Sequence, residues 1–186
     1  MAMALLKPFS WAHGRFTCYL RLQEYYILTP TSRCPGRQLV PFLEDPLLGP
    51  DTESEDCLTI NIYRPQGHTS SSKKLPVSVL IPGGAFNRGA ARMHNTHTML
   101  ANSPEPFVAV SMQYRIGVFG GLNTELTEKE GLLNLGLRDM YAALEWVQEN
   151  IPAFGGDPDD VTIMGLSAAA HGVSERNYSF VRRCSN

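Results

Sequence analysis

The chain has 186 residues, of which 43% are hydrophobic and 18% charged, with 16 Gly and 13 Pro. This length and composition are typical of a globular domain with a hydrophobic core of its own. The formal net charge of −2, from 16 basic and 18 acidic residues, does not indicate nucleic acid or a membrane surface as a partner. No apolar run approaches the length of a membrane span.

The first half of the chain opens with its least patterned part. Residues 1–33 show no sustained period, and the start, MAMALLKPFSW, is a poor match to a signal peptide because Lys7 and Pro8 interrupt its apolar patch. Residues 35–56 are rich in Pro, Gly and acidic groups, which predicts a loop. No C-x-x-C pair is present and the compartment stays undecided, since there are only four cysteines: Cys18, Cys34, Cys57 and Cys184.

Three short apolar segments predict strands. The segment LTINIY (58–63) alternates apolar and polar residues, which is typical of a half-buried strand. Residues 64–74 are small and polar and predict an exposed connection. The segments PVSVLI (76–81) and FVAVSMQY (107–114) are short and β-branched, which favours buried strands of a sheet covered on both faces.

The period then changes to that of a helix. In LGLRDMYAALEWVQENI (135–151), apolar residues step by three or four and line one helical face: Leu137, Met140, Leu144, Val147 and Ile151. Pro152, Gly155 and Gly156 end this helix. The segment VTIMG (161–165) predicts another buried strand. Strand, helix and strand with short joins form a βαβ unit, which indicates a parallel sheet and an α/β fold.

Ser167 follows the last of these strands, in the sequence GLSAA (165–169). A nucleophile elbow lies at such a point, because a strained turn lifts the serine hydroxyl above the sheet and a helix N-terminus follows it. The positions two before and two after the serine must be small. Gly165 meets this requirement, and Ala169 meets it less well. Taken alone, this pattern favours an ordinary turn serine.

A second small-residue turn strengthens the hydrolase hypothesis. Acyl transfer needs backbone N–H groups directed at the tetrahedral oxyanion, and the segment VLIPGGAF (79–86) leads a buried strand directly into Gly83, Gly84 and Ala85. A plain β-turn is the alternative interpretation. Two such turns, each after a buried strand and in this chain order, favour a serine hydrolase.

Four segments together resemble the type-B carboxylesterase family, the cholinesterase-like branch of the α/β-hydrolases. They lie in the family's order and cover about residues 34–171: EDCLTINIYRP (55–65), YRIGVFGGL (114–122), NLGLRDMYAALEWVQENIPAFGGDP (134–158) and FGGDPDDVTIMGLSAA (154–169). The resemblance implies a partial α/β-hydrolase fold, comprising the N-terminal part of the central sheet through the elbow. It predicts a divergent segment at 1–33, a partial esterase domain at 34–173 and a divergent tail at 174–186.

The resemblance also implies the site residues. It gives Ser167 the role of nucleophile in a carboxylic ester hydrolase, with a small-molecule ester as substrate and no cofactor or metal. The implied oxyanion donors are the N–H groups of Gly84, Ala85 and Ala168. It implies a Cys34–Cys57 disulfide, and two free buried cysteines are the alternative. His94 and His97 lack acidic or cysteine ligands nearby and are interpreted as surface or loop histidines.

The chain departs from the family in places that bear on activity. Leu166 stands where the family usually has glutamate. A serine needs a histidine oriented by an acid, and the family places both well downstream, whereas the 19 residues after Ser167 hold one acid, Glu175, and one histidine, His171. His171 leaves the following helix laterally. We therefore expect a chain truncated at both ends with impaired activity; an inactive fragment, pseudoenzyme or binding module is the alternative.

Overall fold

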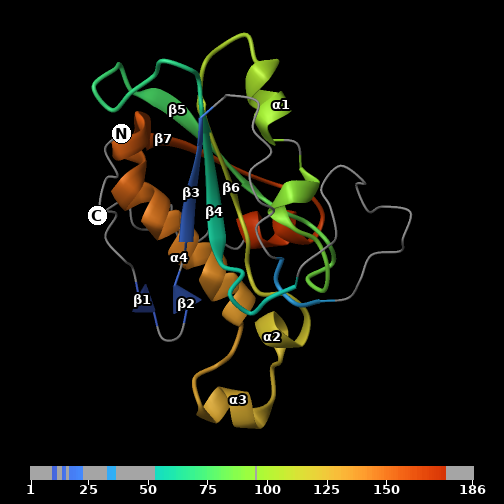
Figure 1. Ribbon diagram of the computed structural model, residues 1–186. Helices are drawn as coiled ribbons and strands as arrows, with labels where there is room; N and C mark the ends of the chain where they lie inside the picture. The colour runs from blue at the N-terminus through green and yellow to red at the C-terminus, as the bar shows by residue number, and fades with distance from the viewer. Residues whose placement is uncertain are drawn as a thin grey trace.

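The computed structural model of the protein describes residues 10–11, 14–15, 17–22, 33–36, 53–94 and 96–174. Two short 3-10 helices, Ala91–Met93 and Ile151–Phe154, accompany the main elements. In chain order (Figure 1) these are β1 (Ser10–Trp11), β2 (Gly14–Arg15), β3 (Thr17–Leu22), β4 (Thr59–Arg64), β5 (Leu75–Ile81), α1 (Thr96–Ala101), β6 (Val108–Met112), α2 (Gly117–Gly121), α3 (Glu125–Lys129), α4 (Leu135–Asn150) and β7 (Gly156–Gly165). Within these residues, no helix has the length and apolar character that a membrane span needs.

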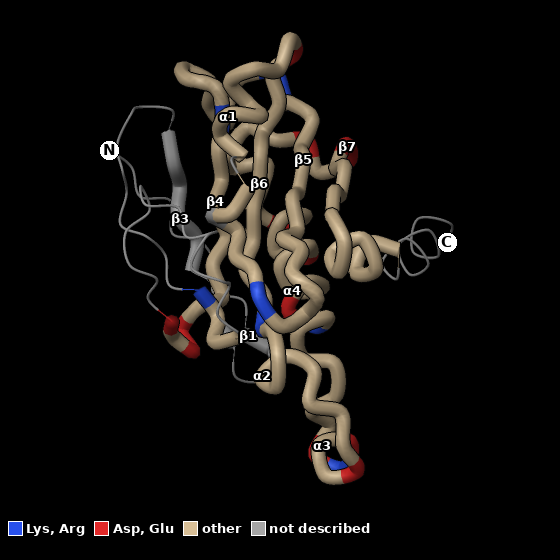
Figure 2. Tube along the Cα trace, turned by 90° about the vertical axis from the view of Figure 1, so that its right-hand side faces the viewer, with Lys and Arg blue, Asp and Glu red and all other residues tan. Residues whose placement is uncertain are grey.

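Five strands form one sheet in the order β3-β4-β6-β5-β7, and Figure 2 shows them side by side in that order. The strand β5 is parallel to both of its neighbours, β6 and β7, which confirms the βαβ unit predicted around α4. The prediction of a parallel sheet is wrong for β4, because β4 runs antiparallel to β6 and parallel to β3. The sheet is therefore mixed. Whether two strands pair parallel or antiparallel depends on both strands, and the apolar pattern of one strand does not specify it.

One face of the sheet carries the hydrophobic core. Residues paired across neighbouring strands lie on the same face, and the pairs Ile62–Val110 and Val79–Ile163 are apolar throughout. The helix α4 packs in the same core through the face predicted from its period. Its buried residues in this core are Met140, Ala143, Leu144, Trp146 and Val147, and Leu137 packs against them. Burial of this apolar surface is the main contribution that holds α4 to the sheet.

The opposite face carries polar residues together with apolar ones such as Leu80, and it is unevenly covered. The paired Asn61 and Ser111 are both buried there, and the Asn61 amide donates to the Ser111 hydroxyl over 3.3 Å. The helix α1 lies against β4 and β6, on the side of the sheet away from α4 (Figure 1). The prediction of a half-buried strand at 58–63 is thus wrong, because Thr59 through Ile62 are buried on both faces.

Coverage also differs from prediction at β5 and β7. All five residues of β6 are buried, as expected for a strand covered on both faces. Along β5, buried Val77 and Val79 alternate with the half-buried Ser78, and Thr162 of β7 is exposed. Both strands were predicted to be buried on both faces, but within the described residues the face away from α4 is only partly covered along β5, where the Ser78 hydroxyl oxygen is buried, and it is more exposed along β7. The pattern of β-branched residues indicates a strand and does not show what packs on it.

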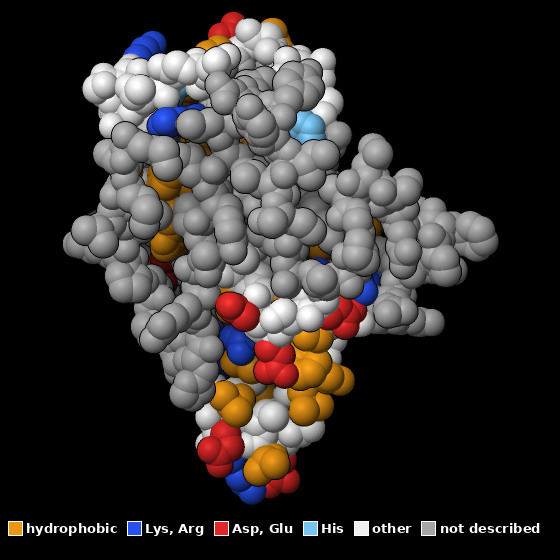
Figure 3. Space-filling model, viewed as in Figure 1, with side chains coloured by type: hydrophobic (Ala, Val, Ile, Leu, Met, Phe, Trp, Pro, Cys, Tyr) orange, Lys and Arg blue, Asp and Glu red, His pale blue; other side chains and the backbone are white. Residues whose placement is uncertain are grey.

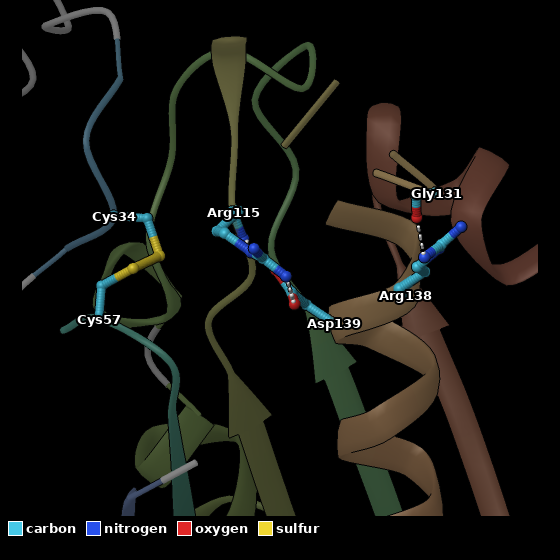
Figure 4. Close-up of polar contacts among 6 residues, drawn as sticks. All are labelled: Cys34, Cys57, Arg115, Gly131, Arg138 and Asp139. Atoms are coloured by element: carbon cyan, nitrogen blue, oxygen red, sulfur yellow. Dashed lines mark hydrogen bonds and ion pairs between the residues drawn. A yellow bond between two sulfur atoms is a disulfide. The ribbon is translucent and has the colours of Figure 1, made fainter. Parts of the chain in front are cut away.

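A disulfide joins Cys34 to Cys57, as the resemblance implied, and the two Cα atoms lie 4.9 Å apart (Figure 4). Both cysteines are buried at the edge of the core. Arg33, directly before Cys34, forms an isolated parallel β-bridge with Glu53, and its guanidinium lies 2.6 Å from the Glu53 carboxylate. Residues 33–36 are thereby attached to the segment that leads into β4.

Exposed apolar side chains gather over α2, where Figure 3 shows hydrophobic groups beside acidic ones. Val118 is 66% exposed, and Phe119 and Leu122 are also exposed. The short helix α3 follows them, with a Thr124 capping box at its start. This end of the molecule lies below the sheet in Figure 1 and joins β6 to α4.

Candidate functional site

The two turns predicted to form the site meet at one edge of the sheet. Because β5 and β7 are adjacent and parallel, with Ile81 paired to Gly165, the segments that follow them leave the sheet at the same edge. A methyl group placed on Gly83 would collide with the carbonyl oxygen of Leu166 and lie 3.6 Å from Cβ of Ser167. The turn after β5 therefore lies directly against the turn that presents the serine.

Ser167 has the backbone conformation of a strained turn. Its φ is +59°, in the left-handed region that costs a non-glycine residue on the order of 1 kcal/mol. The residue is exposed, whereas Ala168 and Ala169 directly after it are buried. Residues 168–174 are helical, and the first turn is closed by the Ala170 N–H, which donates to the Ser167 carbonyl over 2.9 Å. The strand ends, the serine projects to solvent and a helix begins, which is the arrangement of a nucleophile elbow.

Of the two small residues that flank the serine, Gly165 is the one that can carry no side chain. A methyl group there would lie 2.7 Å from the Ala169 carbonyl oxygen and 2.9 Å from the Ala169 Cβ. The end of the strand and the start of the helix are thus in direct contact. Ala169 is fully buried, and its methyl group occupies this contact without displacing the turn. The alanine at 169 is accommodated because position 165 is glycine.

The turn after β5 holds three consecutive residues with positive φ: Gly84 at +132°, Ala85 at +54° and Phe86 at +58°. A side chain on Gly84 would collide with the Arg88 carbonyl, so this position requires glycine. The Gly84 carbonyl accepts hydrogen bonds from the N–H groups of Asn87 and Arg88. Successive left-handed residues turn their N–H groups toward one side of the backbone, an arrangement that binds anions. We call residues 82–86 the glycine turn.

The resemblance implied three backbone N–H groups as oxyanion donors. Among the turn and loop hydrogen bonds of the described residues, none is donated by the N–H of Gly84, Ala85 or Ala168. Gly84 and Ala85 lie in the glycine turn, and Ala168 follows the serine at the start of the next helix. The structure thus places a left-handed serine and the glycine turn side by side, whereas the two sequence patterns indicated two turns and did not specify their contact.

Sequence reasoning did not identify the residues behind the glycine turn. The hydroxyl of Tyr114 donates to the Pro82 carbonyl over 3.0 Å, and burial raises the pKa of Tyr114 to about 12. The next residue, Arg115, forms a bidentate ion pair with Asp139 of α4 (Figure 4). The Nη2–Oδ1 distance is 2.6 Å and the Nε–Oδ2 distance is 2.8 Å. The hydrogen bonds that Arg115 donates to Asp139 raise the pKa of Arg115. The available signal was a charged residue, Asp139, beside the apolar face of a helix.

Other candidate residues lie apart from this site. His171 is exposed on the helix after Ser167, and no hydrogen bond within the described residues joins the Ser167 hydroxyl to a histidine or a carboxylate. Glu175 lies outside the described residues. His94 is half-buried, and burial lowers its pKa. His97 is exposed and its ring centroid lies 6.4 Å from that of Tyr63. No group of three or more possible metal ligands occurs in the part of the chain that the structure describes.

Comparison with known proteins identifies the family of the chain. Residues 28–180 match the model of the carboxylesterase family. The chain belongs to this family. A secreted triacylglycerol lipase of Gibberella zeae is 43% identical over 138 residues, which are 73% of this chain and 23% of that lipase. A carboxylesterase 5A of Canis lupus familiaris is 48% identical over 121 residues, 65% of this chain and 20% of the relative.

Solved structures extend the likeness to the fold. The crystal structure of EstA from Aspergillus niger superposes with a TM-score of 0.65 at 38% identity, over 76% of this chain and 26% of that one. The partial α/β-hydrolase fold predicted for this carboxylesterase-family chain is thereby confirmed. The chain spans about a quarter or less of the length of each of these three proteins.

Proposed function

We propose that this chain supplies the nucleophile and the oxyanion donors of a serine carboxylic ester hydrolase, with Ser167 as the nucleophile. One observation carries the proposal. Ser167 projects from a left-handed turn at the end of β7, directly beside a glycine turn in which the N–H groups of Gly84 and Ala85 donate no hydrogen bond to the described residues. The substrate class is a small-molecule carboxylic ester, in agreement with the names of the relatives, a triacylglycerol lipase and a carboxylesterase.

The chemical step follows from these groups. The Ser167 hydroxyl attacks the ester carbonyl carbon, and the carbonyl oxygen becomes an oxyanion that accepts hydrogen bonds from Gly84, Ala85 and Ala168. Collapse of this intermediate releases the alcohol, which takes up the proton lost by the serine, and leaves an acyl–serine. Water then hydrolyses the acyl–serine to the acid. Each oxyanion donor contributes about 3 kcal/mol of transition-state stabilisation in enzymes of this mechanism.

The proposal assigns to this chain the nucleophile and the oxyanion donors, and the domain that holds them is proposed to span residues 34–173. It leaves the general base and its orienting acid to groups outside the described residues. An oxyanion hole that acts without a complete triad retains about 10³–10⁴-fold acceleration over water. The acyl–serine of the 186-residue chain is therefore expected to form slowly.

A catalytically inactive esterase relative is the second candidate. Leu166 favours it, because this residue is apolar and 69% exposed at the position where the family resemblance implies a glutamate. An apolar group there cannot assist the charge separation that acylation requires. The two candidates differ in whether Ser167 becomes acylated at all.

The experiment is acylation of the full chain with p-nitrophenyl acetate, followed by release of p-nitrophenol and by peptide mass spectrometry. Wild type should carry the acetyl group on Ser167, and Ser167→Ala should lose it. Ser70→Ala is the matched control, because Ser70 is an exposed loop serine on the β4–β5 connection. Equal labelling of the wild type and Ser167→Ala, or no labelling of either, would establish the inactive relative instead.

A further inference from the structure

We propose that Tyr114 is a positioning residue for the oxyanion donors, acting through the backbone of the glycine turn. The inference rests on the proposed function, because it names the residue that keeps the donors of that site in place. Three successive residues of positive φ, two of them non-glycine, persist only where the surrounding structure restrains them. Groups outside the turn must therefore restrain it.

Hydrogen bonds from one segment bracket the turn at both ends. On the near side, the Tyr114 hydroxyl donates to the Pro82 carbonyl, immediately before Gly83 and Gly84. On the far side, the Gly117 N–H donates to the Phe86 carbonyl over 2.6 Å. Both donors belong to residues 114–117, which follow β6 at the same edge of the sheet. We call this stretch the supporting segment.

The supporting segment is itself rigidly held. Asp139 accepts from the Arg115 backbone N–H as well as from its guanidinium, and the Asp139 side chain is 5% exposed. Methyl groups on Gly120 or Gly136 would collide with the Arg115 carbonyl, so α2 and α4 approach the segment as closely as backbone allows. The segment can therefore transmit a fixed position to the turn.

The same helix also contacts the nucleophile side of the site. Met140, next to Asp139, has its sulfur 2.8 Å from a methyl group placed on Gly172, in the helix that follows Ser167. Adjacent residues of α4 thus touch the support of the glycine turn and the helix of the serine turn. The helix α4 therefore holds the oxyanion donors and the nucleophile in fixed positions relative to each other.

Tyr114 is the member of this arrangement that can be changed most cleanly. The residue is 3% exposed, so the hydroxyl is removed from water and its hydrogen bond to Pro82 is not replaced by solvent when lost. Tyr114→Phe removes one oxygen and leaves the ring in the core. Tyr63→Phe is the matched control, because the Tyr63 side chain is half-buried at the end of β4 and its hydroxyl makes no hydrogen bond to the described residues.

The first measurement is amide hydrogen exchange in the full chain. The N–H groups of Asn87, Arg88 and Gly117 report on the turn, because they donate to carbonyls within it. Tyr114→Phe should raise their exchange rates about ten-fold and leave those of β6 unchanged, and Tyr63→Phe should alter neither set. Unchanged exchange in Tyr114→Phe, or a uniform rise across β6, would overturn the proposal.

The second measurement is the dependence of Ser167 acetylation on p-nitrophenyl acetate concentration. Tyr114→Phe should lower the limiting rate about ten-fold and leave the half-saturating ester concentration unchanged, since the hydroxyl acts on the donors and not on ester binding. An unchanged limiting rate would contradict the proposal. If the wild type forms no acyl–serine, the proposed function fails, and the exchange rates alone decide whether Tyr114 positions the turn.

Discussion

Loss of the Cys34–Cys57 disulfide should lower the stability of the fold by an amount that follows from its place in the chain. The two cysteines lie 23 positions apart in the sequence. In the chain-entropy treatment, a crosslink that closes a loop of about this length lowers the conformational entropy of the unfolded state and so raises its free energy by about 3.4 kcal/mol. Domains are commonly stable by about 5–15 kcal/mol, so the crosslink supplies a large part of the total.

Urea unfolding followed by circular dichroism measures this effect. With a denaturant dependence of roughly 2 kcal/mol per molar urea, the midpoint should fall by about 1.7 M when the disulfide is reduced. The double variant Cys34→Ala/Cys57→Ala should unfold near the midpoint of the reduced wild type, and reductant should leave this variant unchanged. The variant controls for effects of reductant on Cys18 and Cys184. A wild-type midpoint that does not respond to reductant would refute the reasoning.

The disulfide should also affect the candidate site, because the residues after Cys34 lie against it. A methyl group on Gly36 would lie 2.6 Å from the Ile116 side chain and 2.8 Å from the Asn87 carbonyl oxygen. Residues 34–36 therefore pack on the supporting segment and on Asn87, which directly follows the glycine turn. We expect reduction to raise exchange at Asn87 and Gly117 more than at β6. Equal protection before and after reduction would show that the contact does not depend on the crosslink.

Two further predictions concern single groups of the site. Ala169→Gly should lower the free energy of unfolding by about 2 kcal/mol, from one buried methyl group and the poor helix propensity of glycine, whereas the exposed Ala170→Gly should cost about 1 kcal/mol in the same urea titration. Burial raises the pKa of Tyr114 from 10.0 to about 12, so between these pH values the Tyr114 hydroxyl stays protonated in the folded state and loses its proton in the unfolded state. The free energy of unfolding should therefore fall as the pH rises from 10 toward 12. Tyr114→Phe should show a shallower loss of stability over that range.

The sequence alone predicted the parts that depend on local pattern. The apolar period of residues 135–151 identified α4 and its buried face, since a helical face is set by spacing along the chain. The small residues around Ser167 and at Gly83 and Gly84 identified both turns, because left-handed backbone and close approach demand such residues wherever the chain folds. The resemblance added the disulfide between Cys34 and Cys57.

The tertiary structure decided what depends on partners distant in the chain. The antiparallel pairing of β4 with β6, the burial of both faces of β4 and the open face of β7 follow from neighbouring elements, and a strand's own residues do not specify them. The contact of the glycine turn with the serine turn requires β5 and β7 to be adjacent and in register. The bond from Tyr114 to Pro82 spans 32 residues, and only the folded sheet edge brings its two atoms together.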